Sequence, residues 1–397
     1  MAEKQVDILI IGGGLTGATL MLALAGRGFS TLLVETNSFS DLTKPDFDAR
    51  TLALSPASVK ILQMLGVWPL LTEHAQAIES IHVSEQNRFG TAQLHGKENA
   101  LGFVVEIQQI NRALHQLLDA ENILAPATLI DLDDRAAIAT VQQQGKVQQV
   151  KATLIVAADG ANSSVRKFAG MRVDRKDYQQ QAIVANIGLN RPHHNHAYER
   201  FTAAGPLAML PMTQQRASLV WAMRPQDAEQ LMALNERDFL KELQRAFGYK
   251  LGRLIKSGTR QLYPLRQAIM PKQIAWPLVF VGNAAHTLHP VAGQGFNLGL
   301  RDVAALAQCI IEQGLNAEML EGYQAMRRYD QKTTTRFTDG LIDIFTSRVP
   351  GLGIARSLGL IAVDNIPSLK SALTRHARGF AGVSPDLVCG IELSEGK

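Results

Sequence analysis

Three glycines near the start of the chain have the spacing needed to approach the phosphates of a dinucleotide. Gly12, Gly14 and Gly17 form the pattern G-x-G-x-x-G directly after the apolar run 6–11. In a strand-turn-helix unit, the first glycine permits the tight turn and the second admits a pyrophosphate next to the backbone. The third lets the helix and the strand pack closely. Glu35 ends a second apolar run about 20 residues later, where a carboxylate binds a ribose diol. A dinucleotide site is therefore predicted, and a glycine-rich turn that binds nothing is the alternative.

A second motif begins where the apolar run 154–158 meets Asp159 and Gly160. Ser163, Ser164 and Arg166 follow in what is expected to be the start of a helix. An aspartate at the carboxyl end of a strand lies where ligands bind in a doubly wound sheet. An ordinary turn with a helix cap explains the same residues equally well.

A third motif follows the apolar run 278–281. It opens with Gly282 and Asn283 and leads into a helix expected at 296–311; its further polar, proline and glycine residues are His286, His289, Pro290, Gly293, Gln294, Gly295, Asn297 and Gly299. Glycines at the start of a helix again indicate a backbone that approaches a ligand. Two histidines without a carboxylate or a third ligand at metal spacing do not predict a metal site.

These motifs require parallel strands that end at one edge of a sheet. The apolar runs 6–11, 30–34, 154–158 and 278–281 are expected to be those strands. Residues 129–150 alternate as an antiparallel excursion would, with a turn at Gln144-Gly145.

The sequence pattern changes at residues 181–270, where it predicts a strand-rich unit with one amphipathic helix over 228–247. Met209, Met212 and Trp221 either line an apolar pocket there or pack in the core, and core packing is the simpler explanation. The strands are expected at 182–189, 197–201, 207–210 and 217–223.

The expected fold is α/β, with a Rossmann-like dinucleotide-binding domain, an inserted β-sheet-rich substrate domain and a helical C-terminal region. The binding domain is expected to comprise 1–77, 101–180 and 271–397, the last with the C-terminal helices. The substrate domain is expected to comprise 78–100 and 181–270.

Composition excludes several classes of protein. The chain has 397 residues with 46% hydrophobic and 19% charged, as in a packed globular protein. A net charge of +4 and the lack of a basic tract with aromatics do not predict nucleic-acid binding. Two cysteines provide no disulfide framework, which favours a reducing cytoplasm.

The C-terminal part is expected to be helical over 317–345 and 353–363, with Lys370, Arg375 and Arg378 beyond. Its many apolar residues form either a solvated helical cap or an amphipathic patch on a membrane surface. No run of 18 uncharged apolar residues occurs, so no membrane-spanning helix is expected.

Together, the three motifs resemble in order and spacing those of the flavoprotein aromatic hydroxylases, the single-component FAD monooxygenases. The resemblance covers nearly the whole chain and implies a Rossmann-like FAD-binding domain. Arg50, otherwise either a phosphate or ribityl contact or a surface arginine, falls where that family has an arginine that contacts FAD. The implied FAD-binding residues are Gly12, Gly14, Gly17, Glu35, Arg50, Asp159, Gly160, Gly282, Asn283, Gly295 and Asn297. The family usually has Gly-Asp where this chain has Gly282-Asn283, so the charge near the flavin differs.

Residues 205–212, 218–221 and 282–299 are similar to those of the ubiquinone-biosynthesis hydroxylases, a narrower group. That resemblance implies a polyprenylated phenol as substrate, NAD(P)H as reductant and O2 as co-substrate. It further implies a cytoplasmic location with peripheral contact at the inner face of the membrane, and association with other enzymes of the pathway.

The implied reaction transfers oxygen from a flavin C4a-hydroperoxide to the phenol ring. Backbone at Pro290, Gly293 and Gly295 is expected beside the flavin. A base that removes the phenol proton is not identified, and His286, His289 and Tyr198 are candidates. Two alternatives remain: an FAD-dependent prenyl-lipid reductase, and a pathway scaffold without catalysis.

Overall fold

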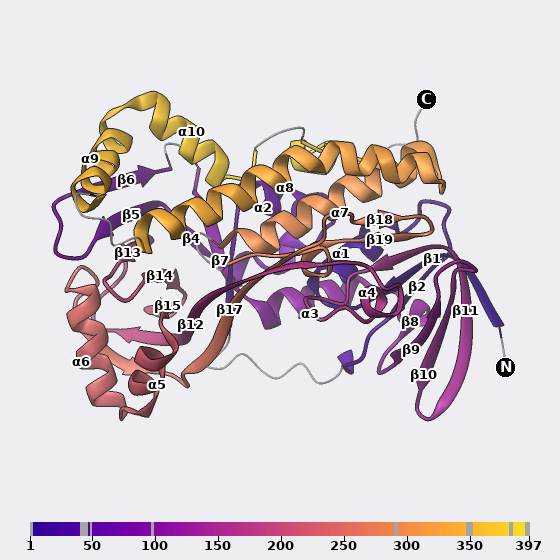
Figure 1. Cartoon of the computed structure of the whole chain (residues 1–397), viewed down its shortest axis with the longest axis horizontal. Helices are drawn as coiled ribbons and strands as arrows, with labels where there is room; N and C mark the ends of the chain where they lie inside the picture. Colours follow the sequence, from indigo (N-terminus) through magenta and orange to yellow (C-terminus); the bar gives the residue numbers. More distant parts are fainter. Residues whose placement is uncertain are drawn as a thin grey trace.

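We describe the chain from a computed structural model, which gives residues 3–39, 47, 50–96, 99–289, 293–346, 352–380 and 384–393. A sheet with a parallel centre lies at one end of the molecule and a large, mostly antiparallel sheet at the other (Figure 1). The long strands of the large sheet, β12 and β17, run from one end toward the other beneath the long helix α8. None of the helices in these ranges is long and apolar enough to cross a membrane.

The first sheet has the order β18-β19-β11-β1-β2-β8, and β10 and β9 extend it beside β11. The pairs β19–β11, β11–β1, β1–β2 and β2–β8 are parallel. Its strands are β1 (Glu3–Ile11), β2 (Thr31–Val34), β8 (Ile123–Leu124), β9 (Thr128–Asp133), β10 (Ile138–Gln143), β11 (Lys146–Ala157), β18 (Ile274–Ala275) and β19 (Leu278–Phe280). The predicted excursion is confirmed, because β9, β10 and β11 pair antiparallel with a turn at Gln144-Gly145.

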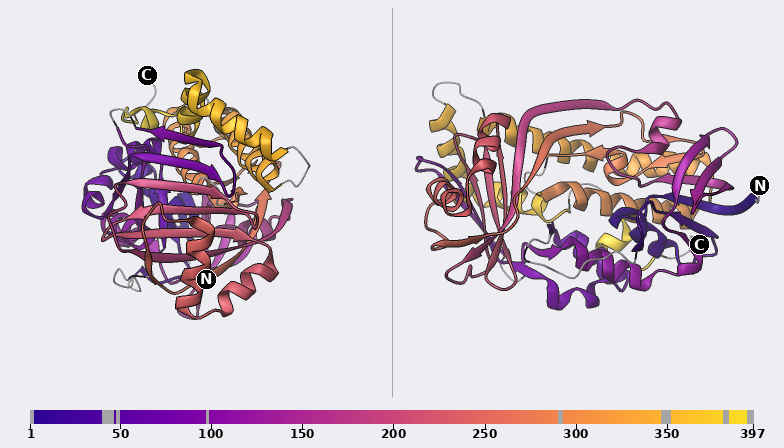
Figure 2. Two further views of the ribbon diagram at one scale, coloured as in Figure 1. Left: turned by 90° about the vertical axis from the view of Figure 1, so that its left-hand side faces the viewer. Right: turned by 90° about the horizontal axis from the view of Figure 1, so that it is seen from below.

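The large sheet has the order β20-β17-β12-β15-β14-β13-β5-β6, with β16 beside β12. Its strands are β5 (Ser80–Glu85), β6 (Thr91–His95), β12 (Asp174–Leu189), β13 (His196–Phe201), β14 (Pro206–Met212), β15 (Arg216–Met223), β16 (Leu254–Ser257), β17 (Gln261–Ile269) and β20 (His286–Thr287). Strands from distant parts of the sequence meet here, since β5 pairs parallel with β13. Figure 2 shows this sheet face-on in its left view.

The two faces of the large sheet differ. One face packs against helices α5 (Pro225–Ala233) and α6 (Glu236–Phe247). We call the other the inner face; it packs against the small sheet of β3 (Thr51–Leu54), β7 (Gly102–Glu106) and β4 (Gln76–Ile78). Met209 and Trp221 lie in the core on the α6 side.

The expected single helix over 228–247 is wrong, because the structure has two helices there. The first helix ends at Ala233, and Asn235 caps the second, with its Oδ1 accepting from the Asp238 amide at 3.0 Å. An asparagine at this position satisfies an orphan amide that a continuous helix would not expose.

The remaining helices cover the parallel sheet and the top of the molecule (Figure 1). They are α1 (Leu15–Leu24), α2 (Pro56–Met64), α3 (Ile107–Leu117), α4 (Ser164–Phe168), α7 (Gln294–Gln313), α8 (Ala317–Thr346), α9 (Leu352–Asn365), α10 (Pro367–Ala377) and α11 (Asp386–Cys389).

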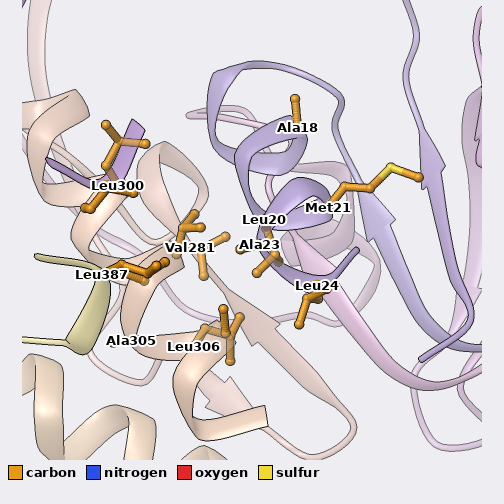
Figure 3. Close-up of a cluster of buried hydrophobic side chains, with 14 of the residues drawn as sticks. Ala18, Leu20, Met21, Ala23, Leu24, Val281, Leu300, Ala305, Leu306 and Leu387 are labelled. Carbon is orange, nitrogen blue, oxygen red and sulfur yellow. The ribbon is translucent and has the colours of Figure 1, made fainter. Parts of the chain in front are cut away.

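Close packing of α1 against α7 holds the first and third motifs together. Figure 3 shows Leu20, Ala23 and Leu24 of α1 near Val281 and Leu306. Alanines on both helices let their backbones approach closely, so the turns that precede α1 and α7 are held in a fixed relation.

Candidate cofactor and active site

All three motifs lie at the carboxyl ends of adjacent parallel strands. The Ala158 amide donates to the Ile11 carbonyl at 2.8 Å, and the Val281 amide donates to the Ala157 carbonyl at 3.0 Å. The Gly12 amide likewise donates to the Val34 carbonyl at 2.8 Å. The strand ends β19, β11, β1 and β2 therefore form one continuous edge, which is where open α/β sheets bind ligands.

The glycines of the first motif have distinct roles. Gly12 has a φ of +105°, and a Cβ there would lie 2.5 Å from the Ala158 carbonyl oxygen. A Cβ on Gly17 would lie 1.9 Å from the Gly12 oxygen, so this glycine permits the packing of helix on strand. A Cβ on Gly14 would meet no protein atom within 4 Å. Gly14 thus leaves open space at the α1 N-terminus, where an anionic phosphate is stabilised.

Glu35 lies beside this turn as predicted, and its carboxylate is held in place by backbone donors. The Gly13 amide donates to Oε2 at 2.7 Å, and the Asn37 amide donates to Oε1 at 2.8 Å. The Asn37 Nδ2 also donates to Oε1, at 2.9 Å, so Oε1 has two donors. Oε2 has one and keeps a further acceptor site, which suits a ribose hydroxyl.

Phe39 and His115 extend the site beyond what the motifs indicated. Their rings stack with centroids 3.6 Å apart, and a Cβ on Gly13 would lie 3.0 Å from the Phe39 ring. Burial lowers the pKa of His115, so its ring is neutral at pH 7. Both rings and Arg112 line a hollow of about 480 Å³. No sequence pattern linked α3 to the strand β2, because the two lie far apart in the sequence.

The two carboxylate oxygens of Asp159 have different surroundings. Oδ2 accepts from the Ser164 amide at 2.6 Å and from the Val165 amide at 3.2 Å, which caps α4. Oδ1 is buried and has no partner among the described residues. A Cβ on Gly160 would meet nothing within 4 Å. The predicted helix cap therefore exists. The other carboxylate oxygen, Oδ1, is an acceptor without a hydrogen-bond donor in the described protein.

The first and third motifs touch directly. Gly282 has a φ of +57°, and a Cβ there would lie 2.8 Å from the Thr16 hydroxyl. A Cβ on Gly299 of α7 would lie 3.2 Å from the Gly282 Cα. Asn283 is exposed at this turn. Glycine at both positions allows α1, the 282–284 turn and α7 to converge.

Asn297 organises the start of α7. Its Nδ2 donates to the Ala53 carbonyl at 2.9 Å and the Gly293 carbonyl at 2.7 Å. Its Oδ1 accepts from the Ser55 amide and the Ser58 hydroxyl at 2.8 and 2.7 Å. These four bonds use the full capacity of an amide side chain, so Asn297 fixes the loop through protein contacts.

Gly293 and Gly295 lie at the α7 N-terminus. Gly293 adopts a left-handed conformation with a φ of +60°, and a Cβ on Gly295 would meet nothing within 4 Å. Pro290 lies outside the described residues. Arg50 has an exposed side chain before β3, and its carbonyl accepts from the Ile107 amide at 2.8 Å.

His286 belongs to a buried ion network behind the third motif. Its Nε2 bonds Asp302, which also accepts from Arg327 at 2.8 Å. Asp330 accepts from Arg301 at 2.7 Å and pairs with Arg327 at 2.7 Å. Burial alone would raise the pKa of Asp302, but His286 and Arg327 outweigh it and hold that pKa below its usual range. His286 is thus engaged with α7.

The other two base candidates lie apart from each other. His289 is buried edge-on against the Tyr178 ring, with centroids 5.0 Å apart, and burial lowers the pKa of His289 to about 4. Tyr198 packs against Phe247 of α6, on the side of the large sheet opposite the inner face.

Comparison with known families agrees with this geometry. The family model described as "FAD binding domain" matches residues 5–338. A ubiquinone hydroxylase of Rhodospirillum rubrum is 36% identical, over 97% of this chain and 92% of that protein. A 3-demethoxyubiquinol 3-hydroxylase of Escherichia coli is 32% identical, over 96% of this chain and 100% of that protein.

Solved structures support the fold. p-Nitrophenol 4-monooxygenase from Pseudomonas putida superposes with a TM-score of 0.78 at 15% identity, covering 96% of this chain and 99% of that one. The expected α/β fold with a Rossmann-like FAD-binding part is therefore confirmed.

Proposed function

We propose that the substrate of this chain is a polyprenylated phenol of ubiquinone biosynthesis. The premise is that the chain belongs to the FAD-binding-domain family and is an FAD-dependent aromatic-ring hydroxylase. The observation that carries the proposal is similarity over nearly the full length to a ubiquinone hydroxylase and to a 3-demethoxyubiquinol 3-hydroxylase. The motif resemblance points within this group to the 2-octaprenyl-6-methoxyphenol hydroxylases.

The residues at the strand edge fit FAD. The open space at Gly14 suits the pyrophosphate, and the Glu35 carboxylate suits the adenosine ribose. The partnerless Oδ1 of Asp159 suits a hydroxyl of the cofactor, because a buried acceptor without a donor is costly. The open space at Gly295 suits the flavin ring, and the left-handed conformations of Gly282 and Gly293 shape the loop beside it.

His286 and Asn297 are positioning residues in this proposal. Both side chains bond to protein groups that hold the third motif, through Asp302 for His286 and through the Gly293 carbonyl for Asn297. They preserve the loop geometry beside the flavin without contacting the reacting atoms.

Bound FAD, reduced by NAD(P)H, supplies the activation of O2 for transfer of one oxygen atom to the ring. The protein must orient the phenol and exclude water from the reacting atoms. The inner face of the large sheet supports this role, since the Ser218 hydroxyl on it accepts from the Thr51 hydroxyl at 2.8 Å. Two residues on, Ala53 lies against Gly293; we call residues 293–295 the flavin loop.

Peripheral membrane contact is assigned to α9 and α10. Ile354 and Leu358 of α9, Leu369 of α10 and Ile366 between the two helices are exposed, and Arg375 of α10 is exposed with them. Large apolar side chains beside a basic residue suit the interface of an anionic bilayer, where a prenylated substrate resides. This surface is equally available to another enzyme of the pathway.

Extraction of quinones from a host that lacks the gene tests the proposal. We expect a prenylated phenol one hydroxyl short, rescued by the wild-type chain but not by Gly14→Val. Its structure identifies the ring carbon that is oxidised. An unchanged quinone profile would exclude the ubiquinone assignment, and accumulation of an unreduced prenyl lipid would favour the reductase.

A further inference from the structure

Strand β13 places one carboxylate on the inner face of the large sheet. Side chains alternate along a strand, so Ala197, Glu199 and Phe201 share a face. Ala197 lies in the apolar cluster with Met212, and Phe201 stacks on Phe345 of α8 with ring centroids 3.4 Å apart. Glu199 lies between these two contacts, on the side away from α6.

The surroundings of Glu199 across the sheet are apolar. Its neighbours on the two adjacent strands are Val83 and Ala208, and Ala208 is followed by Val220. Among the described residues, the Glu199 carboxylate has no hydrogen bond and no ion pair. A carboxylate left in this state loses hydration without recovering it from the protein.

Charged groups near Glu199 are engaged elsewhere. Glu85, beside Phe201, pairs with Arg356 of α9 at 2.5 Å. Arg200, next in sequence, points to the opposite face and donates to the Ala246 carbonyl at 3.0 Å. On α8, Asp339 bonds Tyr178 near β17.

Burial, with no charged neighbour contributing, raises the pKa of Glu199 to about 7. Its solvent-accessible surface nevertheless shows that Glu199 is only half-buried.

The same face leads to the flavin loop. Val220 is two strands from Glu199, a separation of about 10 Å at the usual spacing between strands. Ser218, two residues before Val220, bonds Thr51 of β3. Ala53 of β3 in turn meets Gly293, where an added Cβ would lie 3.3 Å from the Ala53 Cβ. A phenol ring lying along this row would have its hydroxyl toward Glu199 and its far edge toward Val220 and Ser218.

We propose that Glu199 is the general base that accepts the ring-hydroxyl proton of the substrate. The phenol O–H bond breaks, the proton passes to a Glu199 oxygen, and the electron pair stays on the phenolate. The phenolate is the stronger carbon nucleophile toward electrophilic oxygen, so the step promotes hydroxylation without a redox partner of its own. This inference rests on the proposed function, because it assumes that the substrate is a phenol.

A binding measurement on the FAD-loaded enzyme tests the contact apart from turnover. The probes are a prenylated phenol and its O-methyl ether, which has no proton to donate. Above pH 7, ionised Glu199 should favour the phenol over the ether by about ten- to hundredfold, as a charged acceptor does. Glu199→Gln should abolish this rise with pH, and Glu199→Asp should keep part of it. The control Tyr198→Phe, next in sequence on the other face, should leave the rise intact.

Turnover supplies the second readout. The wild-type kcat/KM should fall as the pH drops below about 7, the pKa at which the base becomes protonated. Glu199→Gln should lower kcat about 100-fold or more and remove this acidic limb. A Glu199→Gln enzyme with the wild-type pH profile and phenol preference would overturn the proposal. A wild-type enzyme that forms no hydroxylated product would instead overturn the proposed function, whatever the variants do. Flavin content and circular dichroism establish folding, and Glu199→Asp decides if Glu199→Gln does not fold.

Discussion

Gly14 and Gly17 are three residues apart, yet the structure constrains them differently. An added Cβ would meet open space at Gly14 but would overlap the Gly12 oxygen, 1.9 Å away, at Gly17. Gly14 therefore leaves room for the proposed phosphate contact, and Gly17 permits the helix to pack on the strand.

Alanine at each position separates these roles. Gly14→Ala should leave the melting temperature of the apoprotein unchanged and weaken FAD binding about tenfold or more, because the methyl occupies the phosphate space. Gly17→Ala should destabilise the apoprotein by about 3 kcal/mol or more through overpacking. Thermal melts of the apoproteins and titration with FAD measure both effects. Equal stability losses in the two variants would contradict these assignments.

Glu199 should reduce stability at neutral pH. A folded pKa raised from 4.5 to about 7 means that the folded state retains a proton that the unfolded state releases. Stability is therefore lost as the pH rises from 4.5 to 7 and stays reduced above. Glu199→Gln should raise the free energy of unfolding at pH 8 by up to about 3 kcal/mol and change it little at pH 4. Denaturant unfolding at the two pH values measures this, and an equal effect at both would refute the burial of this carboxylate.

At the scale of elements, the network between the third motif and α8 locks α7 in place. Asp302 joins His286 before α7 to Arg327 on α8, and all three side chains are buried. Removing one partner from such a network leaves uncompensated charges, which costs more than a surface pair contributes.

Asp302→Asn should destabilise the protein by about 3–5 kcal/mol at pH 7. Because the folded pKa of Asp302 is depressed, its stabilisation is present above the ordinary value of 3.8 and is lost as the pH falls below it. The difference from wild type should therefore shrink in acid. Asp343→Asn, an exposed change on α8, is the control and should have little effect. A pH-independent difference would show that Asp302 is not the charged member of the network.

The three glycine motifs could be predicted from the sequence because each is local. A strand, a turn and a helix start lie within about 15 residues, and their order gives the shared sheet edge. The two-helix break at Asn235 was missed because the apolar periodicity of residues 228–247 continues across it. Glu199 was also missed, because its apolar surroundings come from other strands. One neighbour is Val83 of β5, which pairs with Glu199 and lies more than a hundred positions earlier in the sequence.

At the scale of the molecule, buried contacts between sheets fix the large sheet relative to the cofactor edge. Arg216 of β15 pairs with Glu106, at the start of α3, at 2.7 Å, and both side chains are buried. The pair spans 110 residues of sequence and leaves no local pattern. Together with the bond from Thr51 to Ser218, it holds the inner face of the large sheet against β3 and β7.

The exposed apolar surface of α9 and α10 should govern membrane affinity. Leu358→Ser combined with Ile366→Ser should reduce binding to anionic phospholipid vesicles about tenfold, because two exposed apolar side chains that would enter the bilayer interface are lost. Ile255→Ser, which alters an exposed apolar residue on β16, should bind like wild type. Cosedimentation with vesicles measures both, and equal binding by all three proteins would exclude this surface as the contact.

The most direct test of the central claim is the origin of the oxygen atom in the product. Purified FAD-loaded enzyme would be given NAD(P)H and a prenylated phenol under ¹⁸O2, and the product analysed by mass spectrometry. We predict one ¹⁸O atom in each hydroxylated ring, with O2 consumed in proportion to product. A product that lacks the label, or a prenyl chain reduced without O2 consumption, would contradict a monooxygenase and leave a reductase on the same scaffold.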